Sequence, residues 1–87
     1  MPVHHALRIQ CRFFARYAEL LGVDQASLEF QAGATVAEAV ERIRREFAGG
    51  TALPPRPLVA VNRVHALYDR RLADGDEVAL LPPLAGG

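Results

Sequence analysis

Hydrophobic and polar residues alternate along two stretches near the beginning of the chain, and this period of two predicts β-strands. The first stretch runs from Ala6 to Ala15 and the second from Gln25 to Gln31. Between them, residues 15–21 have apolar side chains at helical spacing and are followed by Gly22, which predicts a short helical turn. We therefore expect a hairpin with a long connection. The residues expected to face the core are Leu7, Ile9, Cys11, Phe13, Ala26, Leu28 and Phe30.

The clearest helix signal lies between Thr35 and Phe47. Thr35 precedes Glu38 by three residues, which is the spacing of a capping box. Apolar residues then recur at helical spacing, so one face of the helix should pack on the core. The opposite face contains glutamate–arginine pairs four residues apart, which stabilise a helix slightly. The apolar residues are Val36, Ala39, Val40, Ile43 and Phe47, and the pairs are Glu38–Arg42 and Glu41–Arg45.

The second half of the chain predicts a loop and three short strands. Glycine and proline are frequent in residues 48–57, which favours an irregular connection. Asn62 and Gly75 mark turns between the strands that follow. The strands expected around these turns are residues 58–61, 64–67 and 77–81.

Together these elements predict an α+β fold with one main helix across one face of the sheet. A single apolar stripe covers only one sheet face, so the other face should meet solvent. Phe14 and Leu81 are assigned to that open face, each at the end of its strand. One exposed hydrophobic residue means little, whereas a contiguous group indicates an interface.

Composition and charge exclude several classes of function. A length of 87 residues with 51% hydrophobic side chains predicts one domain, residues 1–87, with a packed core. Ten basic residues, all arginine, balance ten acidic ones, which argues against nucleic acid or an anionic membrane as the main partner. A single cysteine, no signal-peptide pattern and no membrane-spanning apolar run predict a cytoplasmic protein.

No pattern of catalytic or metal-binding residues is present in the sequence. It has no phosphate loop, dinucleotide fingerprint or triad spacing. Cys11 alternates with core-facing residues and is expected to be a buried structural thiol. His4 and His5 are adjacent near the N-terminus and His65 stands alone, so we expect no metal site. By its own residues the chain is not expected to be a catalyst.

The tail, residues 82–87, is the stretch whose composition points to chemistry. Pro82 and Pro83 restrict the backbone and disfavour helix, so the tail should leave the domain extended. Gly86 and Gly87 have no side chains and can enter a channel too narrow for other residues. Such a tail suits presentation of its terminal carboxylate to another protein's active site. The alternative is a frayed end, as many chain termini are.

Three segments together resemble the small subunits of molybdopterin synthase, which are ubiquitin-like sulfur carriers. These are RFFARYAELLG at 12–22, AVN at 60–62 and DGDEVALLPPLAGG at 74–87. The resemblance extends over nearly the whole chain, and its most specific part is the Pro-Pro-x-x-Gly-Gly ending. It implies a β-grasp fold with a mixed sheet.

The resemblance also implies a chemical role for Gly87. In the family, an activating enzyme uses ATP to adenylate the terminal carboxylate, which is then converted to a thiocarboxylate. The tail enters the large subunit, whose residues catalyse sulfur transfer to a pterin precursor in molybdenum cofactor biosynthesis. The chain would thus be a non-catalytic sulfur donor that binds no cofactor itself and joins the large subunit in a heterotetramer. The residues implied for tail insertion are Pro82, Pro83, Leu84, Ala85 and Gly86.

The family also binds its partners through an apolar patch on the open sheet face. Phe14 and Leu81 match this patch, and His65 occupies a third position that is commonly apolar. Two other functions stay open. One is a sulfur carrier for thiamine or cysteine biosynthesis, and the other is a ubiquitin-like modifier conjugated to proteins through Gly87. The proline-containing ending favours the molybdopterin branch.

Overall fold

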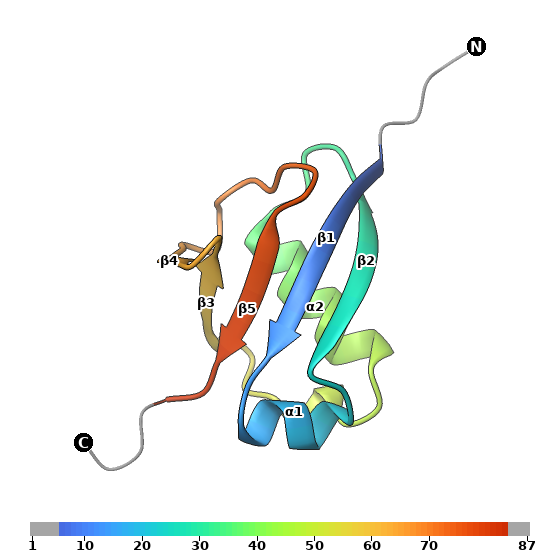
Figure 1. Cartoon of the computed structure of the whole chain (residues 1–87), viewed down its shortest axis with the longest axis vertical. Coiled ribbons are helices and arrows are strands. Elements are labelled where there is room, and N and C mark those ends of the chain that lie inside the picture. The colour runs from blue at the N-terminus through green and yellow to red at the C-terminus, as the bar shows by residue number, and fades with distance from the viewer. Residues whose placement is uncertain (1–5, 84–87) are drawn as a thin grey trace.

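The structure is a computed structural model that describes residues 6–83, and residues 1–5 and 84–87 lie outside the described part (Figure 1). Within this part the chain forms five strands, two α-helices and one 3₁₀ helix. The strands are β1 (Ala6–Phe13), β2 (Gln25–Gln31), β3 (Leu58–Val61), β4 (Val64–His65) and β5 (Glu77–Leu81). The helices are α1 (Arg16–Leu21), α2 (Val36–Glu46) and the 3₁₀ helix η1 (Gly50–Ala52).

The strands form one mixed sheet in the order β2-β1-β5-β3-β4. β1 and β5 run parallel at its centre, and the other neighbouring strands are antiparallel. α2 lies across one face of the sheet and α1 lies at one end of it, which leaves the opposite face open (Figure 1). This arrangement is the ubiquitin-like β-grasp, and it confirms the predicted α+β fold.

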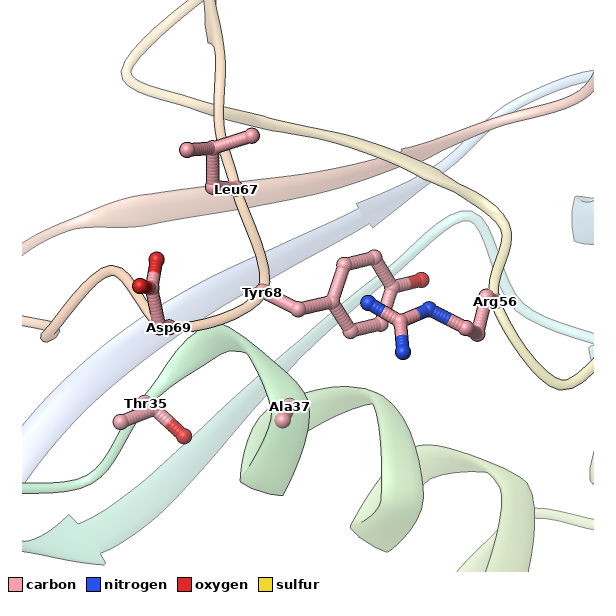
Figure 2. Close-up of a pocket in the computed structure, with 6 residues that line it drawn as sticks. All are labelled: Thr35, Ala37, Arg56, Leu67, Tyr68 and Asp69. Atoms are coloured by element: carbon pink, nitrogen blue, oxygen red, sulfur yellow. The ribbon is translucent and has the colours of Figure 1, made fainter.

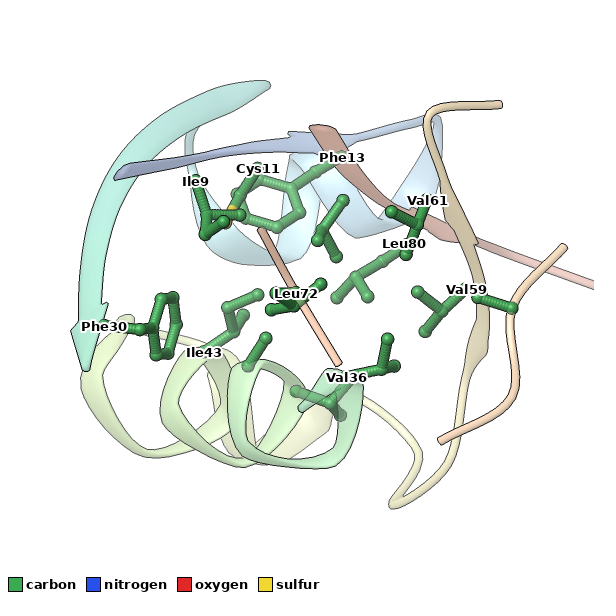
Figure 3. Packing of buried hydrophobic residues seen from close by; sticks show 14 of the residues in the cluster. Ile9, Cys11, Phe13, Phe30, Val36, Ile43, Val59, Val61, Leu72 and Leu80 are labelled. Atoms are coloured by element: carbon green, nitrogen blue, oxygen red, sulfur yellow. The ribbon is translucent and has the colours of Figure 1, made fainter. Parts of the chain in front are cut away.

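The core lies between the sheet and α2. Ile9, Cys11 and Phe13 of β1 are at most 2% exposed, and their side chains are directed toward the helix (Figure 3). The rings of Phe13 and Phe47 meet edge to face with centroids 5.7 Å apart, an arrangement that aromatic pairs favour. The apolar stripe of α2 is buried as predicted, through Val36, Ala39, Val40 and Ile43.

α2 begins at the predicted cap. The Oγ1 atom of Thr35 accepts a hydrogen bond from the backbone N–H of Glu38 at 3.4 Å. The N–H groups of Val36 and Ala37 donate to carbonyl oxygens in the distant segment 68–70. The first amides of a helix have no partner inside the helix itself, and here the cap and this segment supply their acceptors.

The predicted boundaries of three elements differ from the observed ones for physical reasons. β1 ends at Phe13 and not at Ala15, because the positive φ of Ala15 turns the chain into α1. β4 ends at His65 and not at residue 67, because the chain then turns to bring the carbonyl groups of residues 68 and 70 to α2. Segment 48–57 is not wholly irregular, since η1 forms in it and Leu53 is buried in the core. Gly50 fits there because a β-carbon would lie 2.4 Å from a backbone oxygen of α2.

One of the two predicted ion pairs on α2 does not form. Glu41 and Arg45 lie 3.5 Å apart as expected. Arg42 instead bonds to Glu46 at 3.0 Å, and its Nη1 donates to the backbone carbonyl of Glu29 on β2. The nearby sheet edge therefore offers Arg42 an acceptor that the helix sequence alone does not reveal.

Candidate functional site

The base of the tail is fixed by the central strand of the sheet. β5 pairs with β1 on one side and β3 on the other, so its end at Leu81 has a defined position. Pro82 is half-buried and Pro83 is exposed. Pro83 lines a hollow of about 300 Å³ with residues of α1 and of segment 52–54. The remaining predicted tail residues, Leu84, Ala85, Gly86 and Gly87, lie outside the described residues, as do His4 and His5.

The register places the predicted interface residues on the open face, but not all together. Phe13 pairs with Leu80, so Phe14 and Leu81 follow at the same level of two adjacent strands. Phe14 is 39% exposed and Leu81 is half-buried. His65 is exposed on β4, where it pairs with Ala60 of β3. It thus lies at the outer edge of the open face, next to Ala60 and two strands away from β5.

Leu58 is a further residue of this face that sequence reasoning did not single out. It lies directly opposite Leu81 on β3 and is 50% exposed. The signal was present in the sequence, since Leu58 alternates with the core-facing Val59. We call the group on the outward face near the end of β5 the open-face patch. It consists of Phe14, Leu58, Ala60, Ala79 and Leu81.

The start of β5 is held by a buried carboxylate. Asp76 is 8% exposed and accepts hydrogen bonds from Asn62 Nδ2 at 2.9 Å, Ala73 N at 2.8 Å and Arg70 Nη1 at 3.3 Å. Burial acts to raise the pKa of Asp76, but the hydrogen bonds and the Arg70 charge outweigh it, and the pKa is lowered. Asn62 also accepts from the Glu77 N–H. This network joins the turn after β3 to β5, and the sequence predicted only a turn there.

Cys11 has the properties of a structural residue, as predicted. Its side chain is fully buried, and desolvation raises its pKa to about 11, although Arg42 acts in the opposite direction. A thiol with this pKa is almost entirely protonated at neutral pH, and the thiolate is the nucleophilic form. Cys11 therefore does not carry sulfur chemistry.

One surface hollow is lined by polar groups that are partly engaged within the protein itself. About 560 Å³ in volume, it opens between the start of α2 and the loop around Tyr68 (Figure 2). The Arg56 guanidinium stacks 4.5 Å from the centroid of the Tyr68 ring, and the Tyr68 hydroxyl donates to the carbonyl of Pro57. The amides at the start of α2 are already bonded.

Two other kinds of site are not found in residues 6–83. No group of three potential metal ligands lies close together there. No helix of this part is long and apolar enough to cross a membrane.

Comparison with known proteins agrees with the resemblance. The chain is 36% identical over 85 residues to the molybdopterin synthase sulfur carrier subunit of Escherichia coli (strain K12), covering 91% of this chain and 99% of that protein. It is 36% identical over 78 residues to the subunit of the same name from Haemophilus influenzae, covering 86% and 94%. The crystal structure of small archaeal modifier protein 1 from Haloferax volcanii aligns with a TM-score of 0.71 at 27% identity, over 90% of this chain and 99% of that one.

The last comparison is with a family model, and the matched region extends into the tail. The model of the ThiS family matches residues 11–87, which include the end of β1, all later elements and the diglycine ending. The two relatives above exceed 30% identity over nearly their whole length. The chain belongs to the ThiS family.

Proposed function

We propose that this chain is the sulfur carrier subunit of a molybdopterin synthase, and that its reactive group is the carboxylate of Gly87. The observation that carries the proposal is the position of the base of the tail. β5 is bonded on both sides and ends at Leu81 of the open-face patch, and Pro82 and Pro83 follow directly. Relatives of nearly the same length have this function in their names. The patch would hold the body of the carrier while the tail reaches a partner's active site.

The chemistry divides between this chain and its partners. The Gly87 carboxylate attacks the α-phosphorus of ATP in an activating enzyme, and pyrophosphate leaves. A sulfur nucleophile then displaces AMP and gives a thiocarboxylate, because the adenylate supplies the leaving group that a free carboxylate lacks. The large subunit receives the tail and directs sulfur to a pterin precursor, so position and orientation are what this chain supplies.

The proposal is tested by loading and transfer in two stages. Incubation with an activating enzyme, ATP and a sulfur source should replace one carboxylate oxygen of Gly87 with sulfur, which intact mass spectrometry detects. The loaded chain, mixed with large subunit and pterin precursor, should then yield the dithiolene product. Deletion of Gly87 should abolish both stages without unfolding the domain. A one-residue extension should do the same, because it moves the reactive group by about 3.5 Å. A folded Gly87 deletion that still donates sulfur would refute the proposal.

A second candidate is a protein modifier conjugated through Gly87. It is favoured by the likeness to small archaeal modifier protein 1. The chain contains no lysine, so it offers no lysine side chain for building chains of itself. The same loading reaction distinguishes the two functions, since a modifier would appear in covalent adducts with other proteins after activation. Loaded protein that yields adducts but no dithiolene product would favour this candidate over the first.

A further inference from the structure

Arg12 lies on the open sheet face, close to the end of β1 and next to the open-face patch. In the register of the sheet its neighbours are Gln25 of β2 and Ala79 of β5, and neither is charged. Arg8, on the same face of β1, lies directly opposite the acidic Glu29. Arg8 therefore has an acid directly opposite on β2, whereas the acid nearest to Arg12 is its diagonal neighbour on β5, Glu77.

The guanidinium of Arg12 is oriented, but its hydrogen-bonding capacity is not met. Its central carbon lies 5.5 Å from the centroid of the Phe14 ring. Nη1 lies 3.7 Å from Oε2 of Glu77, which is an ion pair too long for a hydrogen bond. Nε is shielded from solvent and has no hydrogen-bond partner within residues 6–83. Phe14 and Glu77 therefore fix the direction of the side chain without satisfying its donors by hydrogen bonds, and a partner would reach the guanidinium through its terminal nitrogens.

Docking on this face would remove water from a charge that is still partly hydrated. The Arg12 side chain is 44% exposed, and a guanidinium desolvated without an acceptor opposes binding strongly. A carboxylate compensates best, because its two oxygens match the planar fork of arginine and carry the opposite charge. The neighbouring Ala79 and Ala60 are buried despite facing away from α2, so an acidic side chain would approach the guanidinium from its solvent-exposed side.

We infer that Arg12 determines partner specificity, and that the large subunit presents an aspartate or glutamate to it next to an apolar surface. The inference rests on the proposed function, because it takes the open face as the docking surface. Phe14 belongs to the open-face patch and also supports the guanidinium, so the apolar and the charged contacts form side by side. A partner lacking that carboxylate would bury Arg12 with only the long ion pair to Glu77 as compensation, and would bind less tightly.

Binding measurements with matched arginine variants test this role. The affinity of the large subunit from the same organism is measured by calorimetry for the wild-type chain, Arg12→Gln and Arg8→Gln, at low and at physiological salt. Arg12→Gln should weaken binding by roughly 30-fold or more, as central arginines of interfaces do. Arg8→Gln should weaken it less than about threefold. Arg12→Gln should also bind with a smaller dependence on salt, and equal thermal melts would show that both variants are folded.

A charge exchange identifies the partner residue. Arg12→Glu should lose binding, and one acid-to-lysine change in the large subunit should restore it while weakening binding of the wild-type chain. Equal affinities of Arg12→Gln and wild type, or failure of every acid-to-lysine change to restore Arg12→Glu, would overturn the inference and leave the proposed function standing. A wild-type chain that does not bind the large subunit at all would overturn the proposed function, and the inference with it.

Discussion

At the scale of single residues, Ala15 has a backbone conformation that its side chain opposes. Its φ is 51° and its ψ is −127°, in a region that glycine occupies readily and residues with a β-carbon rarely do. Ala15 directly follows Phe14 and begins α1, so this turn determines where Phe14 leaves β1. The strain is located beside a residue of the open-face patch, and in the proposed function a fixed direction of the Phe14 ring would serve docking.

Replacement of Ala15 by glycine should therefore stabilise the protein. Relief of strain is worth about 1–3 kcal/mol, and the greater freedom of glycine in the unfolded chain removes about 0.5–1 kcal/mol of that gain. Thermal unfolding should show a rise in midpoint for Ala15→Gly. Ala32→Gly is the control, since Ala32 is exposed in a turn and has no positive φ. A fall in midpoint for both variants would show that Ala15 is not strained.

The lowered pKa of Asp76 predicts how the stability of the protein depends on pH. Its pKa is lowered in the folded protein, whereas an aspartate in the unfolded chain has a pKa of about 3.9. Its stabilising contribution is thus complete above that value and is lost as the pH falls through the lower folded pKa. Asp76→Asn should flatten the acid side of the stability curve, because an amide does not titrate.

The same substitution should also cost stability at neutral pH. Asn62, Ala73 and Arg70 all donate to the Asp76 carboxylate, and loss of hydrogen bonds to a buried charged group costs roughly 2–3 kcal/mol. Urea unfolding at pH 7 and at pH 3 measures both effects. Asp69→Asn, at an exposed position, is the control and should change the unfolding free energy by less than about 0.5 kcal/mol. If the unfolding free energy of Asp76→Asn changed with pH in parallel with that of the wild type, Asp76 would not be the group responsible for the pH dependence.

At the scale of elements, Arg42 connects α2 to the free edge of the sheet. β2 is an outer strand, and the unpaired backbone groups of such strands invite pairing with another molecule. Arg42 donates to the Glu29 carbonyl, pairs with Glu46 and stacks 4.8 Å from the centroid of the Phe30 ring. One side chain thus occupies an acceptor of the edge and shields an aromatic residue behind it.

Arg42→Ala should expose this edge. We expect a loss of about 1 kcal/mol of unfolding free energy and concentration-dependent self-association in sedimentation experiments. Arg45→Ala is the matched control, because Arg45 is on the same helix and pairs only with Glu41 and Glu46 on its exposed face. Equal behaviour of the two variants in both measurements would show that Arg42 does not protect β2.

The elements themselves could be predicted because one face of every long strand and of α2 is buried. A period of two or of 3.6 residues is then forced on the sequence, and β2 and β5 begin and end where the pattern predicts. What could not be predicted depends on residues distant in sequence. Asp74 and Asp76 lie in the same turn, and only the position of Asn62 and Arg70 in space makes Asp76 the buried one. The partner of Arg42 and the early end of β4 follow from similarly distant contacts.

At the scale of the whole molecule, one face of the sheet packs against α2, and the other is open and is the docking surface of the proposed function. The face toward α2 holds the core, and the open face presents apolar residues beside the start of the tail. Docking and chemistry are therefore separable in the proposed function. The body of the protein determines affinity through the open-face patch, and the tail determines whether a docked carrier can react.

Alanine substitutions test whether binding to the large subunit depends on the open-face patch or on any exposed hydrophobic side chain. Phe14→Ala and Leu58→Ala should each weaken binding to the large subunit by about 1–3 kcal/mol, as apolar anchors of interfaces do. Val64 is the matched control. It is 68% exposed, more than either patch residue, but it pairs with the core-facing Val61 and so lies off the patch. Val64→Ala should bind like wild type, and all three variants should still accept sulfur at Gly87 when the activating enzyme is in excess. If Val64→Ala weakened binding as much as Phe14→Ala, the partner would contact the β4 edge and not the open-face patch.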